Sequence, residues 1–375
     1  MFENVKKLLD VSEKVGTPAM EVSVFHNGEP VFYERRGVLE EDGTPLPDNT
    51  LYNIYSCSKF ITCAAALKLF ERGAYRLEDD LADYIPAFGD MRVKKESGIF
   101  KAERRIKISQ LFDMTAGLNY NCESEEMKQG IKETGGVCGT LKMMDYVAKM
   151  PLEFEPGERW NYSLCHDVIA ALVEAVSGER FGEFVKREIF DKLGMSDSSF
   201  SYPEQKVGRI CSQYMFNREK KCYENIGKGT YRYRLGTEYE SGGAGCVTSI
   251  SDYMKFLEGI RCGKVLLSET VELMKQNRLS ESQIKTFWGA AEYGYGLGVR
   301  TPLPSKKRTD FGWGGAAGAY GAVDDVNGIT VYYSQHVLAS PMAPLRKDFI
   351  EAAKLDLGYE AFVEDMYNGE GKSLA

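Results

Sequence analysis

Residues 56–72 read SCSKFITCAAALKLFER, and Gly73 follows them as a candidate C-terminal helix cap. From Phe60 to Phe70 the stretch is apolar on nearly every side. A helix without a polar face belongs in the middle of a large core rather than on a surface. The stretch therefore predicts a central buried helix that begins at Ser56.

The segments on both sides of this helix predict a sheet assembled from the two ends of the chain. Residues 20–26 and 30–36 alternate as strands do, and Asn27-Gly28 between them is a strong hairpin signal. Three later segments are typical of strands in the same antiparallel sheet: 293–301, 317–324 and 328–335.

Helical patterns fill most of the chain between and after these strands, at residues 1–15, 106–114, 167–177, 181–193, 251–260 and 342–355. Strands at both ends with helices between them indicate the α+β class. We expect one domain over 1–375. Its α/β subdomain covers about 1–85 and 240–360, and its mostly helical subdomain covers about 86–239. Residues 201–245 show no clear periodicity and predict long loops.

Composition excludes several classes of function. The chain has 375 residues, a formal net charge of −8 and a pI near 5.3, which disfavours a nucleic-acid partner. No segment has the continuous apolar run of a signal peptide or of a membrane span. The nine cysteines form no C-x-x-C pair, which fits a reducing cytosol, so we expect a cytoplasmic protein.

Metal chemistry has no support in the sequence. His26, His166 and His336 lie far apart and lack neighbours at the spacing of metal ligands. We therefore expect no metal and no cofactor, and His166 is interpreted as a bystander. The sequence makes no prediction of the oligomeric state.

The residues best suited to catalysis are Ser56 and Lys59 in the run SCSK. Side chains three positions apart share one face of a helix, so the Ser56 hydroxyl and the Lys59 amine can meet, while Ser58 points elsewhere. A serine at a helix start also lies near unpaired backbone N–H groups. Taken alone, S-x-x-K is common by chance. In the alternative interpretation the serine is only a helix cap and the lysine only a surface charge. The apolar helix favours the catalytic interpretation. Such a helix would bury the Lys59 ammonium, and a buried ammonium without a partner is costly.

The wider sequence resembles the serine β-lactamases, the penicillin-binding proteins and their esterase relatives. The resemblance covers most of 17–355, and several motifs in the same order are far more specific than S-x-x-K alone. The segments that carry it are 53–62 (NIYSCSKFIT), 71–73 (ERG), 77–80 (LEDD), 108–118 (ISQLFDMTAGL), 155–157 (EPG), 162–163 (YS), 177–178 (SG), 241–245 (SGGAG), 293–298 (YGYGLG) and 311–315 (FGWGG).

Two of the three motifs of that family depart from its pattern here. S-x-x-K is present, but Leu164 stands at the Asn position of Tyr-x-Asn, where only Tyr162 matches. Trp313 stands where a Lys or His begins the third motif, K-T-G or H-x-G. These departures resemble the carboxylesterase and acyltransferase branch, which shares a Tyr-Ser-x-x-x-Asp run, here from Tyr162 to Asp167.

The resemblance implies a role for each matching residue. Ser56 is the acylated nucleophile, and Tyr162 takes its proton because the Lys59 ammonium stabilises the phenolate. The N–H groups of Ser56 and Ala316 form the oxyanion hole. The substrate is bound by Trp313, Gly314, Gly315 and Leu164.

Structural interpretations remain open for three residues. Tyr162 can be a core tyrosine beside Trp160, and Trp313 a core aromatic without a substrate contact. For Asp167, a helix N-cap is favoured over a catalytic role.

The function expected from these residues is that of a serine hydrolase with an acyl-enzyme intermediate, and most specifically a carboxylesterase acting on small acyl esters. Leu164 and Trp313 replace polar recognition by apolar surface, so β-lactams should be poorer substrates. Arg234 and Arg300 remain candidates for a cation that replaces the missing one.

Three alternatives stay open: a β-lactamase, a peptidase or amidase on D-amino-acid peptides, and a non-catalytic binding protein. The intact Ser56, Lys59 and Tyr162 argue against the last of these. A Ser-His-Asp hydrolase of another fold is disfavoured, because no G-x-S-x-G elbow is present. The expected partner is a small-molecule ester or amide.

Overall fold

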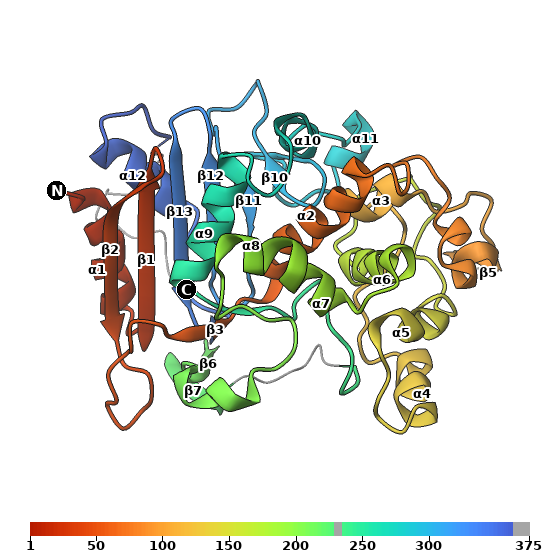
Figure 1. The fold of residues 1–375 in the computed structure, drawn as a ribbon, viewed down its shortest axis with the longest axis horizontal. Coiled ribbons are helices and arrows are strands. Elements are labelled where there is room, and N and C mark those ends of the chain that lie inside the picture. The colour runs from red at the N-terminus through yellow and green to blue at the C-terminus, as the bar shows by residue number, and fades with distance from the viewer. Residues whose placement is uncertain (229–234, 363–375) are drawn as a thin grey trace.

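A seven-stranded sheet with the strand order β2-β1-β13-β12-β11-β10-β9 forms one half of the molecule in the computed structural model, which describes residues 1–228 and 235–362 (Figure 1). Every neighbouring pair in it is antiparallel. Its strands are β1 (Ala19–His26), β2 (Glu29–Gly37), β9 (Gly294–Tyr295), β10 (Arg300–Thr301), β11 (Phe311–Gly314), β12 (Tyr320–Asp324) and β13 (Ile329–Gln335). The predicted α+β class, with an antiparallel sheet built from both ends of the chain, is confirmed.

The N-terminal hairpin has the turn that its sequence predicts. Asn27 and Gly28 have φ angles of 52° and 90°, the left-handed geometry that an Asn-Gly turn adopts readily. Strand β1 then pairs with β13, placing Val22 opposite Tyr333. The first strand of the chain is thus held between its neighbour in sequence and a strand near the other end.

Three smaller sheets complete the strands. They are β3 (Leu51–Asn53) with β8 (Val247–Ser249), β4 (Arg92–Lys95) with β5 (Gly98–Lys101), and β6 (Gln213–Asn217) between β7 (Cys222–Gly227) and β14 (Val337–Leu338).

The helices are α1 (Glu3–Lys14), α2 (Ser58–Glu71), α3 (Ile108–Phe112), α4 (Glu125–Glu133), α5 (Thr140–Val147), α6 (Cys165–Ser177), α7 (Phe181–Val185), α8 (Asp191–Leu193), α9 (Ile250–Arg261), α10 (Ser268–Met274), α11 (Glu281–Ile284) and α12 (Asp348–Asp356). Shorter helical turns are η1 (Tyr55–Cys57), η2 (Leu81–Asp83), η3 (Pro86–Asp90), η4 (Lys186–Phe190) and η5 (Glu204–Arg209). In the described ranges, no helix combines the length and the apolar character needed to cross a membrane.

Helices cover both faces of the large sheet. One face, which includes Val22 and Tyr333, packs against α1 and α12. The opposite face packs against α9 and α2, with Tyr253 stacked on Tyr332 at 4.3 Å between ring centroids and Phe60 against Phe311 at 6.0 Å. The alternation of the strands explains both contacts, because successive side chains point to opposite faces.

Helix α2 is the central buried element, as its composition predicts. Its residues from Ser58 to Leu67 are all buried, including Lys59. In Figure 1 it runs from the sheet into the helical half, where it packs against α6. Because α2 is buried, its surroundings hold the side chains of its first turn in place.

Three expectations about secondary structure are wrong in detail. Residues 293–301 form two short strands, because the chain turns back at Gly298, whose φ is 86°. Residues 201–245 contain the hairpin β6–β7, whose partly exposed strands have no clear apolar alternation. The last helix begins at Asp348 rather than at 342, and turns precede it. Residues 229–234 of the predicted loop lie outside the described residues.

Candidate active site

Ser56 lies in the turn η1, immediately before α2. The residue before it, Tyr55, has a left-handed backbone with φ of 47°. Ser56 is half-buried, whereas Ser58 is fully buried and its hydroxyl accepts a hydrogen bond of 3.0 Å from the Cys246 amide. Of the two serines in the motif, Ser56 is therefore the one within reach of a ligand.

The Lys59 ammonium is fully buried and donates to three oxygens. Its Nζ lies 3.2 Å from Ser56 Oγ, 2.7 Å from the Gly243 carbonyl oxygen and 3.2 Å from the Tyr120 hydroxyl. An ammonium has three donors, so all of them are used. Among the described residues no carboxylate lies within 4.0 Å of it, so neutral groups hold the charge.

Tyr162 lies in the loop before α6, and its hydroxyl points to Ser56. The two oxygens are 2.6 Å apart, with the phenol donating. The Lys59 Nζ is 4.7 Å from the centroid of the Tyr162 ring. The structure thus brings together the hydroxyl, the amine and the phenol, although Tyr162 is distant from Ser56 in the chain.

Tyr120 is a member of this group that the sequence reasoning missed. Its ring stacks on that of Tyr162, with 5.4 Å between centroids and 8° between planes, and the Lys59 Nζ is 5.1 Å from its centroid. Only its position two residues after the 108–118 motif could have drawn attention to it.

The segment after β11 lies against η1. The Cys57 thiol donates to the Trp313 carbonyl at 3.5 Å. A Cβ on Gly315 would stand 2.2 Å from the Ile54 carbonyl oxygen, so only glycine permits this approach. Ala316 follows and is exposed, beside the turn that carries Ser56.

Two of the predicted substrate-binding residues are buried. Leu164 is the residue before α6 and is 2% exposed within the main core, so it offers no wall to a ligand. This corrects the prediction, which rested only on its position two residues after Tyr162. Trp313 is 4% exposed, and its ring stacks on Tyr162 at 6.1 Å between centroids.

The three tryptophans of the chain form one aromatic cluster with Tyr162. The ring centroid of Trp160 is 6.2 Å and that of Trp288 is 6.3 Å from that of Tyr162, and Trp288 lies 5.5 Å from Trp313. Trp288 is 66% exposed, so the cluster reaches the surface of the molecule.

Asp167 is not a helix N-cap, because α6 begins two residues earlier, at Cys165. Its Oδ1 accepts hydrogen bonds from the Tyr239 hydroxyl at 2.9 Å and the Ser241 hydroxyl at 2.7 Å. Its Oδ2 has no hydrogen-bond partner among the described residues. A Cβ on Gly243 would stand 2.4 Å from this oxygen and 3.3 Å from Lys59 Nζ, so Gly243 lies between the two charges.

His166 is buried in the core behind the site. Burial lowers the pKa of its imidazole to about 3, and its Nε2 lies 3.2 Å from the Phe112 carbonyl oxygen. A neutral ring that donates to a backbone carbonyl fits this position, and it does not contact Ser56.

Of the two arginines considered as replacement cations, Arg300 already has a carboxylate partner. Arg300 is 6% exposed and forms an ion pair of 2.6 Å with Asp310. Arg234 lies outside the described residues. In the part of the chain that the structure describes, no group of three His, Cys, Asp or Glu side chains is arranged to hold a metal ion.

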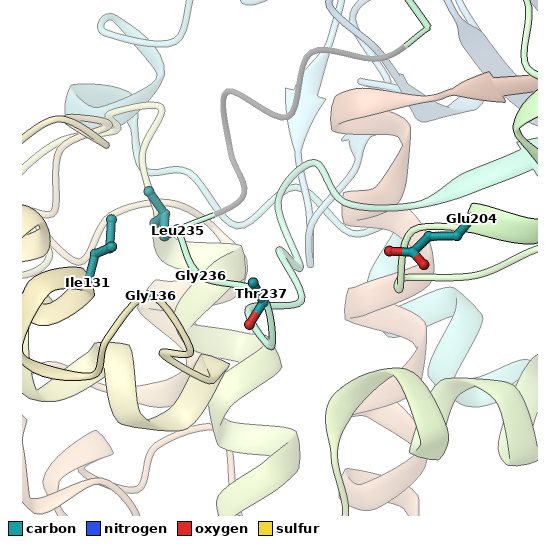
Figure 2. Close-up of a pocket in the computed structure, with 6 residues that line it drawn as sticks. All are labelled: Ile131, Gly136, Glu204, Leu235, Gly236 and Thr237. Carbon is teal, nitrogen blue, oxygen red and sulfur yellow. The ribbon is translucent and has the colours of Figure 1, made fainter.

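A separate pocket of about 400 Å³ lies elsewhere in the molecule (Figure 2). None of the predicted catalytic residues lines it, so it is distinct from the site at Ser56. Its lining residues are Ile131, Gly136, Glu204, Leu235, Gly236 and Thr237.

Solved structures share this fold. EstCE1, described as a hydrolase with promiscuous acyltransferase activity, is 22% identical, with a TM-score of 0.77 over 93% of this chain and 97% of its own. The simvastatin synthase LovD from Aspergillus terreus is 19% identical, with a TM-score of 0.80 over 95% of this chain and 98% of its own. The chain thus shares the fold of these two proteins.

Sequence comparison gives the family. A family model described as Beta-lactamase matches residues 4–354, and the chain belongs to this family. Among curated relatives, esterase EstB from Burkholderia gladioli is 26% identical over 337 residues, which cover 82% of this chain and 83% of EstB.

Proposed function

We propose that the protein is a serine hydrolase that forms an acyl-enzyme on Ser56, and that its substrates are small acyl esters. The observation that carries the proposal is the contact of one half-buried hydroxyl, Ser56 Oγ, with the Tyr162 phenol at 2.6 Å and the Lys59 ammonium at 3.2 Å. A hydroxyl becomes a nucleophile when an adjacent base accepts its proton.

Acylation uses these groups in a fixed order. Tyr162, as the phenolate stabilised by Lys59, accepts the Ser56 proton while Oγ forms a bond to the acyl carbon. The N–H groups of Ser56 and Ala316 bind the oxyanion of the tetrahedral intermediate. The intermediate collapses, the ester C–O bond breaks, and Tyr162 returns the proton to the departing alcohol.

Deacylation repeats these steps with water in place of the alcohol. Tyr162 accepts a proton from the water as the water oxygen bonds to the acyl carbon. The second tetrahedral intermediate then collapses, the bond from the acyl carbon to Ser56 Oγ breaks, Tyr162 returns the proton to Oγ, and the carboxylic acid leaves. Tyr120 does not exchange a proton in this scheme; it helps to hold Lys59 in place through its 3.2 Å hydrogen bond.

Two observations favour esters over β-lactams. Trp313 stands at the motif position where a cation would pair with a β-lactam carboxylate, and its ring supports Tyr162 instead. The relative EstB is named an esterase. A second function, acyl transfer, is favoured by the likeness to EstCE1, which is described as having promiscuous acyltransferase activity.

Labelling of the nucleophile tests the proposal directly. Wild type, Ser56→Ala and Ser58→Ala are exposed to a fluorophosphonate, and the intact mass of each is measured. We expect one label on wild type and on Ser58→Ala, whose hydroxyl is buried against Cys246, and none on Ser56→Ala. A label on Ser56→Ala would contradict the assignment of Ser56 as the nucleophile.

Turnover of p-nitrophenyl butyrate and of a chromogenic cephalosporin then tests the substrate class. We expect a higher kcat/KM for the ester. A higher value for the cephalosporin would place the protein with the β-lactamases instead.

A further inference from the structure

Tyr55, the residue before Ser56, holds a backbone conformation that its own side chain disfavours. Its φ of 47° lies in the left-handed region, which crowds the Cβ of any residue other than glycine. Such a conformation persists only where the surroundings hold it. Because η1 begins at Tyr55, this conformation sets the direction of the Ser56 amide and of Ser56 Oγ.

The Tyr55 side chain is held by segments that are distant in the chain. Its ring is buried in a small apolar cluster with Ala244 and Ala317, and Leu338 packs against this cluster. Its hydroxyl accepts a hydrogen bond from Nε2 of Gln213 in the interior of the molecule. The apolar contacts have no preferred direction, whereas the hydrogen bond does, so the hydrogen bond fixes the orientation of the phenol.

Gln213 is itself anchored. It is the first residue of β6 and is fully buried. The amide of Ser212 donates to the Leu39 carbonyl at 2.9 Å, and the amide of Tyr214 donates to the His336 carbonyl at 2.9 Å. The Gln213 side chain therefore projects from a backbone that is held on both sides.

Packing alone does not account for a glutamine at this position. Its Oε1 is buried and has no hydrogen-bond partner among the described residues. A buried acceptor without a donor is destabilising, and two apolar side chains of similar shape in place of Gln213 and Tyr55 would avoid this penalty. The direction that the amide gives to the Tyr55 phenol supplies the reason for a polar pair here.

We propose that Gln213 is a positioning residue for the nucleophile. Through its hydrogen bond it fixes the Tyr55 side chain, and the fixed side chain holds the left-handed backbone that directs Ser56 Oγ at Tyr162 and the Ser56 amide at the oxyanion. Gln213 acts only through Tyr55 and does not react. The inference rests on the proposed acylation of Ser56, to which it adds an element, β6, that lies outside the motifs of the predicted catalytic residues.

Two single variants test the hydrogen bond. Tyr55→Phe removes the hydroxyl and keeps the ring, and Gln213→Leu removes the amide and keeps a similar volume. We expect each to lower kcat on p-nitrophenyl butyrate about 10-fold, as for loss of one buried hydrogen bond, with KM changed by less than about twofold. The rate of fluorophosphonate labelling of Ser56 should fall by the same factor, because it reports on the nucleophile without deacylation.

Tyr75→Phe is the matched control. The Tyr75 hydroxyl is also buried, and it donates to the carbonyl of Ala66, in the second half of α2, at 2.8 Å. Its removal should lower the free energy of unfolding, measured in urea, and leave kcat and the labelling rate at their wild-type values. Equal losses of kcat in Tyr75→Phe and Tyr55→Phe would show that any lost buried hydrogen bond slows the reaction, which would overturn the proposal.

The double variant Tyr55→Phe with Gln213→Leu separates positioning from stability. It removes both polar partners together with the unpaired Gln213 oxygen, so its free energy of unfolding should equal or exceed that of each single variant. Its kcat should stay about 10-fold below wild type, equal to the single variants, because the same interaction is lost in all three. A kcat that recovers together with stability would contradict a positioning role.

Labelling also separates this inference from the proposed function. If wild type takes up no label, the acylation of Ser56 fails, and the role of Gln213 fails with it. If wild type is labelled on Ser56 while Tyr55→Phe and Gln213→Leu are labelled at the same rate, the nucleophile stands and the role of Gln213 alone is refuted.

Discussion

In the proposed mechanism, Lys59 and Tyr162 have different roles in activating Ser56, and their hydrogen bonds differ accordingly. The ammonium is held by three partners: the Gly243 carbonyl, the Tyr120 hydroxyl and Ser56 itself. The Tyr162 hydroxyl is directed at Ser56 Oγ at 2.6 Å. In this proposal a proton that leaves Ser56 has one short path, and Lys59 stabilises the Tyr162 phenolate that accepts it.

This division predicts unequal effects for the two stacked phenols. Tyr162→Phe removes the proton acceptor, and kcat should fall by about 10³-fold, within the range for loss of a general base. Tyr120→Phe removes one of three hydrogen bonds to Lys59, and kcat should fall by about 10-fold or less, as for loss of one modest hydrogen bond. Steady-state rates on p-nitrophenyl butyrate check both. Equal losses would show that the proton does not pass through Tyr162.

His166 predicts how stability depends on pH. Burial lowers the pKa of its imidazole from 6.5 to about 3. Between these two pH values the imidazole is protonated in the unfolded chain and neutral in the folded protein. The stability from the neutral ring is complete above pH 6.5 and declines as the pH falls towards 3. The decline is about 1.4 kcal/mol per pH unit, or about 2 kcal/mol between pH 6.5 and 5.

His166→Gln isolates this contribution, because an amide can still donate to the Phe112 carbonyl but does not titrate. Urea unfolding at pH 7.0 and 5.0 should show a smaller acid-induced loss for the variant than for wild type. Other buried groups act equally in both proteins; burial raises the pKa of Asp113 to about 6, for example, which opposes the effect of His166. Parallel pH profiles for the two proteins would refute the prediction.

At the scale of elements, the approach of the β11 segment to η1 depends on a single glycine. Gly315→Ala would place a Cβ 2.2 Å from the Ile54 carbonyl oxygen. We expect this clash with the backbone to move the Ala316 amide away from Ser56. We expect kcat on p-nitrophenyl butyrate to fall about 100-fold, as for loss of an oxyanion-hole donor. Gly139→Ala is the control, since its Cβ meets nothing within 4 Å and its φ is −77°. Full activity of Gly315→Ala would mean that Ala316 does not bind the oxyanion.

The elements that the sequence predicts well are those whose patterns are local. Helix α2 is predicted by its apolar composition, and the β1–β2 hairpin by Asn27-Gly28 between alternating segments. The hairpin β6–β7 was missed because its strands are only partly buried and lack an apolar alternation.

The candidate site was predictable only where its residues belong to motifs. Ser56, Lys59 and Tyr162 were predicted in this way, and the structure brings their side chains together. Tyr120 was not, since it joins the site through a tertiary contact with Lys59, which lies 61 positions away in the chain. Leu164 shows the converse error: a motif position was assigned to the site, but the start of α6 turns its side chain into the core.

At the scale of the whole molecule, the two ends of the chain form one structural unit. Strand β1 pairs with β13, and α1 and α12 lie together on the same face of the sheet (Figure 1). Helix α1 has no side-chain cap of its own at Phe2. The Asp356 carboxylate at the end of α12 takes that place, accepting from the amides of Asn4 at 3.1 Å and Val5 at 3.0 Å.

Asp356 should therefore stabilise the protein without a role in catalysis. Asp356→Ala leaves the first amides of α1 without their acceptor, and the free energy of unfolding should fall by about 1–2 kcal/mol, as for the loss of a helix cap. Asp356→Asn keeps an oxygen acceptor and should lose less. Urea unfolding measures both variants, and kcat on p-nitrophenyl butyrate should match wild type, since α1 and α12 cover the face of the sheet opposite α2. A stability equal to wild type in Asp356→Ala would mean that the sheet holds α1 in place without this contact between the chain ends.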